Sequence, residues 1–233
     1  MRLPQPRRLS ALELLREWRV VRDLAASALQ GIPADLPRGH GETVMVIPGF
    51  GATDAATRTL RNRLTRLGYV VSGWQLGRNR GAVERDLQRL LPHFDALHAA
   101  AGNTPVSLVG WSLGGVIARE LARLRPTATR RVITLGSPLV GGPKYTFTAS
   151  WYARQGLDLE RAEQKVAARE RTTPLPCPLL SLYSRHDGMV HCGASIDPYH
   201  DNVRHQEVRS SHLGMCLSPE VLRAVATELA AAA

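Results

Sequence analysis

The chain has 233 residues, of which 44% are apolar and 21% charged, and its formal net charge is +10. This length and composition indicate one globular domain with a sizeable core, and they exclude intrinsic disorder, a collagen-like chain and a small disulfide scaffold. The positive charge comes almost wholly from arginines spread along the chain, because Lys144 and Lys165 are the only lysines. We interpret this as composition bias and expect no nucleic-acid partner.

The beginning of the sequence lacks the pattern of a signal peptide. Residues 1–8 carry arginines and two prolines, and no long apolar core follows, so we expect a cytoplasmic location. The longest uncharged stretch, residues 96–118, is interrupted by glycine, proline and other polar residues, which argues against a membrane span.

Residues 10–30 are predicted to form an amphipathic helix. Ser10 and Glu13 have the spacing of a capping box, and apolar residues then recur at helical spacing opposite several arginines. We expect the apolar stripe to pack on the body of the domain, as such stripes ordinarily do. Peripheral contact with an anionic membrane surface is the alternative that the basic residues leave open.

From Thr43 onward, short apolar runs alternate with helical segments. The predicted strands are 43–47, 69–74, 106–110, 131–135, 179–183 and 203–208. The first predicted helix is capped by Thr53 or Asp54 and reaches about Leu67, and the others are 83–100, 113–124 and 219–229. Nearly continuous apolar strands separated by helices form parallel sheets that are covered on both faces. The expected fold is therefore α/β, with a mostly parallel sheet of about six strands.

Residues 141–173 interrupt this alternation. We interpret them as a small helical cap or lid inserted into a single domain that spans residues 1–233. Aromatic side chains in the cap are expected to receive a substrate, and the alternative is that they form a small core of the cap itself. The residues predicted to line the substrate pocket are Trp111, Tyr145, Phe147 and Trp151.

A GxSxG segment, Gly110 to Gly114, lies where a predicted strand meets a predicted helix. Such a sharp turn projects its central serine above the C-terminal edge of a parallel sheet, and its glycines allow the strand and the helix to approach. The turn also leaves the backbone N–H of Leu113 at a helix N-terminus, facing any oxyanion formed there. Ser112 is thus the candidate nucleophile, and the alternative is a glycine-rich turn with an incidental serine.

A serine nucleophile needs a base and a group that orients the base. Asp187 follows the predicted strand 179–183, and His212 follows the last strand, so both emerge at the same sheet edge as Ser112. The competing residues are Asp197 and Asp201 for the acid, and His186, His191, His200 and His205 for the base. A zinc site is an alternative for the group His186, His191, Cys192, His200, Asp201 and His205. No pair among them has the helical spacing of metal ligands, and we assign no metal.

In these features the sequence from about Val44 to Leu229 resembles the α/β-hydrolase superfamily, specifically its serine esterase and lipase branch. The matching segments are the possible oxyanion loop 47–51, the elbow at Ser112, the acid turn 184–190 and the histidine loop 211–214. The resemblance implies an α/β-hydrolase fold, and it implies that the backbone N–H of Phe50 is the second oxyanion donor beside that of Leu113.

The implied reaction is hydrolysis of a small-molecule acyl ester through an acyl-enzyme, with no cofactor. His212 takes the proton of Ser112, and Asp187 orients His212. An acyltransferase or a thioesterase would use the same three residues. A catalytically inactive protein associated with a membrane or with nucleic acid is the remaining alternative.

The three cysteines have neither CxxC spacing nor an even count. Cys192 lies five residues after Asp187, and Cys216 lies four after His212, so the two cysteines come close if the acid and the base meet. A disulfide between them would tie the two catalytic loops together, although a reducing cytosol opposes it. We expect Cys177 to be buried and inert.

Overall fold

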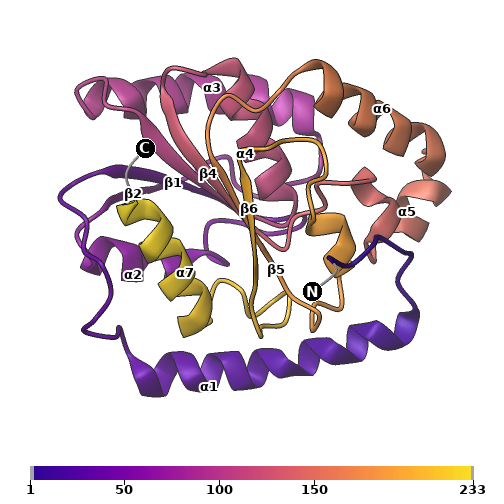
Figure 1. Cartoon of the computed structure of the whole chain (residues 1–233), viewed down its shortest axis with the longest axis horizontal. Helices are drawn as coiled ribbons and strands as arrows, with labels where there is room; N and C mark the ends of the chain where they lie inside the picture. The colour runs from indigo at the N-terminus through magenta and orange to yellow at the C-terminus, as the bar shows by residue number, and fades with distance from the viewer. Residues whose placement is uncertain (1–2, 232–233) are drawn as a thin grey trace.

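The computed structural model describes residues 3–231 and contains one six-stranded sheet, in which every neighbouring pair of strands is parallel (Figure 1). The strand order is β2-β1-β3-β4-β5-β6. The strands are β1 (Thr43–Ile47), β2 (Val70–Gly73), β3 (Val106–Trp111), β4 (Thr129–Leu135), β5 (Leu179–Tyr183) and β6 (Val203–Glu207). The predicted fold class is confirmed. Residues 1–2 and 232–233 of the predicted domain lie outside the described residues.

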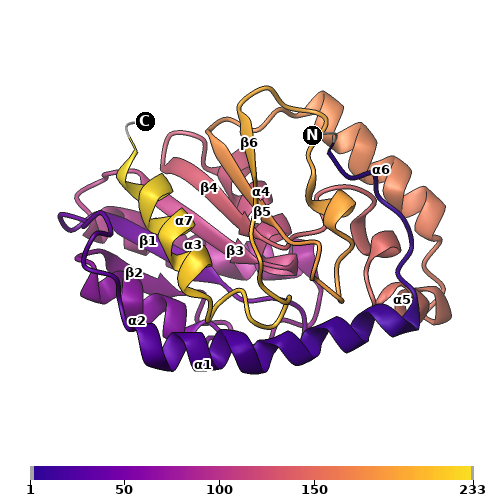
Figure 2. The same ribbon diagram turned by 60° about the horizontal axis from the view of Figure 1, so that its bottom comes forward.

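Helices cover both faces of this sheet (Figures 1 and 2). One face carries α2 (Arg58–Arg66) and α7 (Pro219–Ala230), and the other carries α3 (Val83–Ala100) and α4 (Leu113–Leu124). Side chains of β1 alternate between the two cores, because successive side chains of a strand point to opposite faces. Val44 and Val46 pack with α2 and α7, whereas Met45 and Ile47 pack with α3 and α4.

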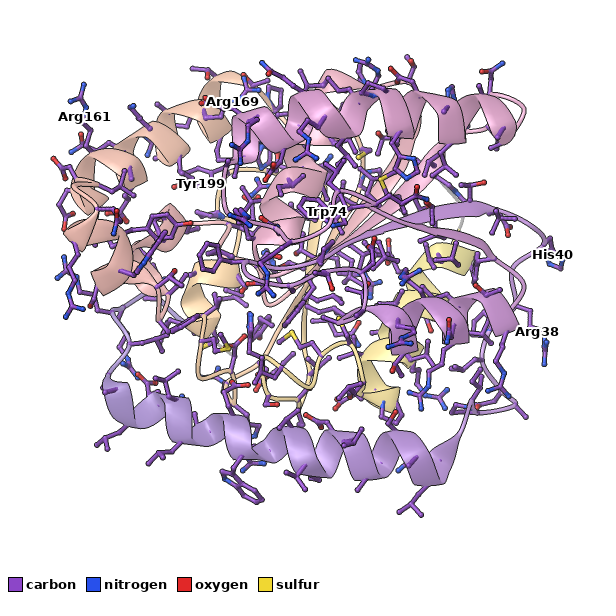
Figure 3. The ribbon with its side chains drawn as sticks, turned by 180° about the vertical axis from the view of Figure 1, so that it is seen from behind. Arg38, His40, Trp74, Arg161, Arg169 and Tyr199 are labelled. Carbon is purple, nitrogen blue, oxygen red and sulfur yellow. The ribbon has the colours of Figure 1, made fainter. Side chains whose placement is uncertain are left out.

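The loop after β2 carries a large core residue. Trp74 is 1% exposed and lies near the centre of Figure 3, whereas Arg38 and His40 lie at the edge of that view. The indole N–H of Trp74 donates to the carbonyl oxygen of Gly77, at 2.9 Å. The ring therefore helps to hold the chain that leads from β2 to α3.

Element bounds agree with the sequence predictions to within two residues, except at the start of α2. That helix was expected to be capped by Thr53 or Asp54 but begins at Arg58. The carboxylate of Asp54 instead accepts hydrogen bonds from the backbone N–H groups of Trp74 and Gln75, both at 3.0 Å. Residues 53–57 therefore form turns that hold the loop after β2.

The predicted N-terminal helix is present as a 3-10 helix, η1 (Ala11–Arg19), that continues into α1 (Val20–Gln30). The predicted capping box between Ser10 and Glu13 forms at its start. The expectation that the apolar stripe packs on the domain is wrong, because the face turned to the domain is the acidic one. Its buried side chains are Glu13, Glu17 and Asp23.

The segment predicted as a cap forms three helices between β4 and β5, and two of them lie together beside the sheet in Figure 1. The three helices are η2 (Gly142–Tyr145), α5 (Ala149–Arg154) and α6 (Leu159–Thr172), of which α5 and α6 are the two labelled in Figure 1. Figure 3 shows Arg161 at the outer end of α6, pointing away from the body. The segment is attached to the loop after β5, because the N–H of Phe147 donates to the carbonyl of Met189 at 2.8 Å.

Candidate active site

Ser112 lies on a sharp turn between β3 and α4, with φ 56° and ψ −125°. A residue other than glycine rarely adopts positive φ, so the surrounding structure must hold this conformation. A Cβ atom at Gly110 would clash with the backbone of residues 114 and 115, and one at Gly114 would clash with the carbonyl of Ile47. The GxSxG pattern therefore follows from the close approach of α4 to β3 and β1.

Asp187 and His212 meet at the same edge of the sheet. The Nδ1 atom of His212 lies 2.7 Å from Oδ2 of Asp187, and both side chains are 2% exposed. The other carboxylate oxygen, Oδ1, accepts from the backbone N–H groups of Met189 at 2.8 Å and Val190 at 2.7 Å. With Nδ1 donating to the carboxylate, Nε2 of His212 is left available for proton transfer.

The surroundings of His212 raise its pKa above the ordinary value. Burial by itself lowers this pKa, but the charge and the hydrogen bond of Asp187, together with the charge of Glu17, raise it by more. The protonated imidazole is therefore stabilised inside the protein. That property suits a base that must hold a proton during a reaction.

Glu17 connects the N-terminal helix to the two loops that carry Asp187 and His212, and sequence reasoning missed it. Its Oε1 accepts from the backbone N–H of Gly188 at 2.7 Å and from that of His212 at 3.1 Å, while Oε2 accepts from Leu213 at 2.9 Å. Asp23 supports the histidine loop in a similar way. The sequence carries no local signal for these contacts, because the partner residues lie more than 170 positions away.

The loop after β1 lies directly beside Ser112. A Cβ atom at Gly49 would come 2.9 Å from the Cβ of Ser112, so a larger residue does not fit there. Within residues 3–231, the backbone N–H groups of Phe50 and Leu113 donate to no other protein group. Both remain available for an oxyanion, which is the role that the resemblance implied for them.

Asn79 holds this loop in place, and the sequence analysis did not single it out. The side chain is fully buried and its amide donates to the carbonyl of Pro48 at 2.9 Å. The backbone of Asn79 exchanges hydrogen bonds with Gly51 at 2.7 Å and Ala52 at 2.8 Å. No local motif marks such a residue, because its partners lie 27 to 31 positions away in the sequence.

Ser112, His212, Phe50 and Leu113 all line one cavity of about 310 Å³, whose other walls are mainly apolar. The hydroxyl of Ser112 and the ring of His212 make no hydrogen bond to each other in the structure. Hydrogen bonds of this kind often tighten only when a substrate binds. The ring of Trp111 lies 5.5 Å from that of His212, and its indole N–H donates to the His212 carbonyl at 3.1 Å.

Two of the four predicted pocket residues, Trp111 and Phe147, line this cavity. Tyr145 and Trp151 do not, which corrects the prediction. The hydroxyl of Tyr145 donates to Glu163 at 2.7 Å, and the ring of Trp151 packs against Phe50 at 5.5 Å. Further walls of the cavity are formed by residues that were not predicted, among them Val83, Tyr152, Leu157, Val166 and Met189.

Three of the six competing acid and base candidates, Asp197, His200 and His205, lie in or beside a separate buried cluster. Asp201 is exposed, and His186 and His191 lie outside this cluster. Glu170, Asp197 and His200 place possible ligand atoms within 4.8 Å of one another. The guanidinium of Arg119 contacts both carboxylates of this group, and that of Arg123 contacts Glu170, so two cations already neutralise the two carboxylates. His205 also faces this group, since its Nε2 accepts from the backbone N–H of Asp197 at 2.9 Å. We interpret the cluster as an ion-pair network, not as a metal site.

The disulfide that the sequence left open between Cys192 and Cys216 is absent, since both residues, like Cys177, are free thiols. Cys216 belongs to the hydrophobic core on the α2 and α7 side, and burial raises its pKa to about 12. Cys192 instead lies at the start of η3 (Cys192–Ser195), where the next residue, Gly193, packs against residues 5–6. The carboxylate of Glu17, not a disulfide, connects the two loops.

Comparison with solved structures identifies the fold. The structure is similar to one of the metagenome-derived lipolytic enzymes LipS and LipT, with a TM-score of 0.63, 17% identity and coverage of 84% of this chain and 94% of that one. Carboxylesterase CesB (YbfK) from Bacillus subtilis gives a TM-score of 0.61 at 12% identity over 96% of this chain and 100% of that one. The thioesterase domain from the curacin biosynthetic pathway gives a TM-score of 0.55 at 14% identity, with coverage of 86% of this chain and 93% of that one. The chain therefore has the α/β-hydrolase fold.

No family model matches the sequence. Over 114 residues it is 36% identical to the polyketide synthase ThaQ of Burkholderia thailandensis, a match that covers 46% of this chain. The match corresponds to only 6% of the length of that much larger protein.

Proposed function

We propose that the protein is a serine hydrolase that cleaves carboxylic esters through an acyl-enzyme. The observation that carries this proposal is the buried hydrogen bond between Asp187 and His212, beside a serine held at positive φ in the same cavity. The fold, which lipases and esterases share, agrees with it.

In the proposed reaction, Nε2 of His212 takes the proton of Ser112 as the serine oxygen attacks the ester carbonyl. The backbone N–H groups of Phe50 and Leu113 donate to the oxyanion that forms. The proton on Nε2 then passes to the leaving alcohol, and an acyl group remains on Ser112. A water molecule repeats the sequence, which releases the acid and restores the hydroxyl of Ser112. Asp187 stabilises the protonated His212 in both halves.

The cavity favours an apolar acyl group. Aromatic and aliphatic side chains form most of its wall, and its volume of about 310 Å³ lies at the small end of ligand pockets. Phe147 and Leu157 at its border are 45% and 39% exposed, so the cavity reaches the surface beside the cap helices. Short and medium acyl chains are therefore the proposed substrates.

Hydrolysis of p-nitrophenyl esters from acetate to palmitate tests this proposal. We expect turnover with the wild type, a maximum at short or medium chain length, and loss of nearly all activity in Ser112→Ala. Ser150→Ala, an exposed serine on α5, is the matched control and retains wild-type activity. Turnover that survives Ser112→Ala would refute the serine mechanism.

A thioesterase is the second candidate, because the sequence matches part of a polyketide synthase and the fold matches a thioesterase domain. Thioester hydrolysis would use the same residues in the same order. Comparing octanoyl thioesters with the octanoyl ester of p-nitrophenol separates the two. A kcat/KM at least about tenfold higher for the thioester would favour this candidate, and the reverse ratio would favour the esterase.

A further inference from the structure

The outward face of the N-terminal helix is an apolar ridge. Five large apolar side chains follow one another at intervals of three residues and are between 56% and 74% exposed. These residues are Leu12, Leu15, Trp18, Val21 and Leu24, and we call them the apolar ridge. The first three lie in η1, where 3-10 winding stacks residues three apart on one edge. The ridge is about 18–24 Å long, from the rise per residue of the two helix types.

The opposite face of the helix keeps the ridge turned outward. Glu17 and Asp23 are buried and accept hydrogen bonds from the loops that carry Gly188 and the residues 210–213. A rotation that covered the ridge would break these bonds and expose the loops. Figures 1 and 2 show the helix along one side of the molecule, with its outer side free of other elements. The hydrogen bonds of Glu17 and Asp23 therefore keep the ridge exposed to solvent.

The charged side chains exposed beside the ridge are arginines. Every acidic residue between positions 11 and 30 is buried, whereas Arg16, Arg19 and Arg22 lie next to the ridge at the same three-residue interval. The guanidinium groups of Arg16 and Arg22 reach backbone carbonyl groups of Arg185 and Arg209 on the adjacent loops. Arg16 and Arg22 also pair with the buried carboxylates of Glu13 and Asp23, so the charged groups that remain exposed along the ridge are cationic. An apolar ridge bordered by arginines and containing a tryptophan has the chemistry of an interfacial membrane helix.

We propose that the apolar ridge docks the protein on the headgroup region of an anionic lipid bilayer. Lipid phosphates would meet the bordering arginines while the ridge enters the boundary between headgroups and acyl chains. A second copy of the chain fits less well, because it would bring two rows of arginines together with no exposed acidic residue on either helix. None of the helices in residues 3–231 has the length and hydropathy needed to cross a bilayer.

The apolar surface continues from the helix toward the catalytic cavity. Leu14 and Phe147 border a common hollow at the start of the helix, and Phe147 also lines the cavity that contains Ser112. Leu213, which is 42% exposed, borders the same cavity and donates its backbone N–H to Glu17. Docking through the ridge would thus bring the cavity close to the lipid surface.

Co-sedimentation with vesicles tests the docking of the full chain without relying on its activity. Vesicles of phosphatidylglycerol and phosphatidylcholine in equal amounts are compared with pure phosphatidylcholine, at low and high salt. The test variant is Leu15→Ser/Trp18→Ser, whose sites are exposed and contribute little to folding. The matched control is Val70→Ser/Leu124→Ser, which removes exposed apolar side chains from β2 and α4.

We expect the wild type and the control to bind the anionic vesicles, with weaker binding at high salt and on phosphatidylcholine. The test variant should bind at least about tenfold more weakly, with an unchanged melting temperature. Wild-type protein that stays in the supernatant, or a test variant that binds like the wild type, would overturn the proposal. A wild-type dimer that the test variant converts to a monomer would assign the ridge to a second copy instead.

Discussion

Replacing Glu17 by glutamine removes one charge from the element that connects the two proposed catalytic loops. The carboxylate accepts three backbone hydrogen bonds, from Gly188, His212 and Leu213. An amide retains one carbonyl oxygen, which keeps the two bonds that Oε1 accepts, but its NH2 group faces the N–H of Leu213. The substitution Glu17→Gln therefore breaks one bond and weakens the other two.

The expected loss of stability follows from these bonds. A hydrogen bond to a charged group stabilises a protein by about 1.5–3 kcal/mol. Loss of that much free energy of unfolding lowers the melting temperature of a domain of this size by about 3–12 °C. Displacement of the histidine loop should also lower kcat, by up to about 100-fold. The charge of Glu17 contributes to the raised pKa of His212, so its removal lowers that pKa. Because the base acts when neutral, the acid limb of the kcat/KM profile should move to lower pH.

The assay is a pH profile of ester hydrolysis combined with thermal unfolding. Glu220→Gln is the matched control, because Glu220 is exposed and accepts one backbone hydrogen bond, from Arg209 at 3.0 Å, and none from Gly188, His212 or Leu213. A structural role alone would lower the melting temperature without moving the acid limb. An unchanged melting temperature together with an unchanged acid limb would refute the reasoning.

Three further substitutions address other parts of the site. Asp187→Asn should lower kcat/KM by about 10³–10⁴ and move its acid limb to lower pH, since the carboxylate raises the pKa of His212; an unaffected pH–rate profile would contradict this. Asn79→Ala, which frees the carbonyl of Pro48, should lower kcat by at least about tenfold with little change in KM, as steady-state kinetics would show. Gly114→Ala places a methyl group against β1 and should cost about 3 kcal/mol or more in denaturant unfolding.

Elements with strong local patterns were predicted well. The bounds of α3, α4, β1 and β5 agree with the sequence predictions to the residue, because apolar periodicity and glycine turns determine them locally. The contact between Asp187 and His212 was predicted from topology, since the ends of parallel strands meet at one sheet edge. These inferences needed no knowledge of distant contacts.

Features that depend on distant contacts were not predicted. The N-terminal helix has a regular apolar stripe, yet its acidic face is buried, because hydrogen bonds between Glu17 and loops almost 200 positions away outweigh burial of the stripe. The walls of the cavity likewise depend on how the cap packs. Tyr145 turns to Glu163 instead of the cavity, and no spacing rule distinguishes the two directions.

Covalent labelling tests the central claim most directly. The protein is treated with an alkyl fluorophosphonate, which traps a serine nucleophile, and the modified peptide is located by mass spectrometry. We predict one adduct, on Ser112, that is absent in Ser112→Ala and forms much more slowly in His212→Ala, because the base that activates the hydroxyl is missing. An unlabelled wild type, or an adduct on another residue, would contradict the proposed site.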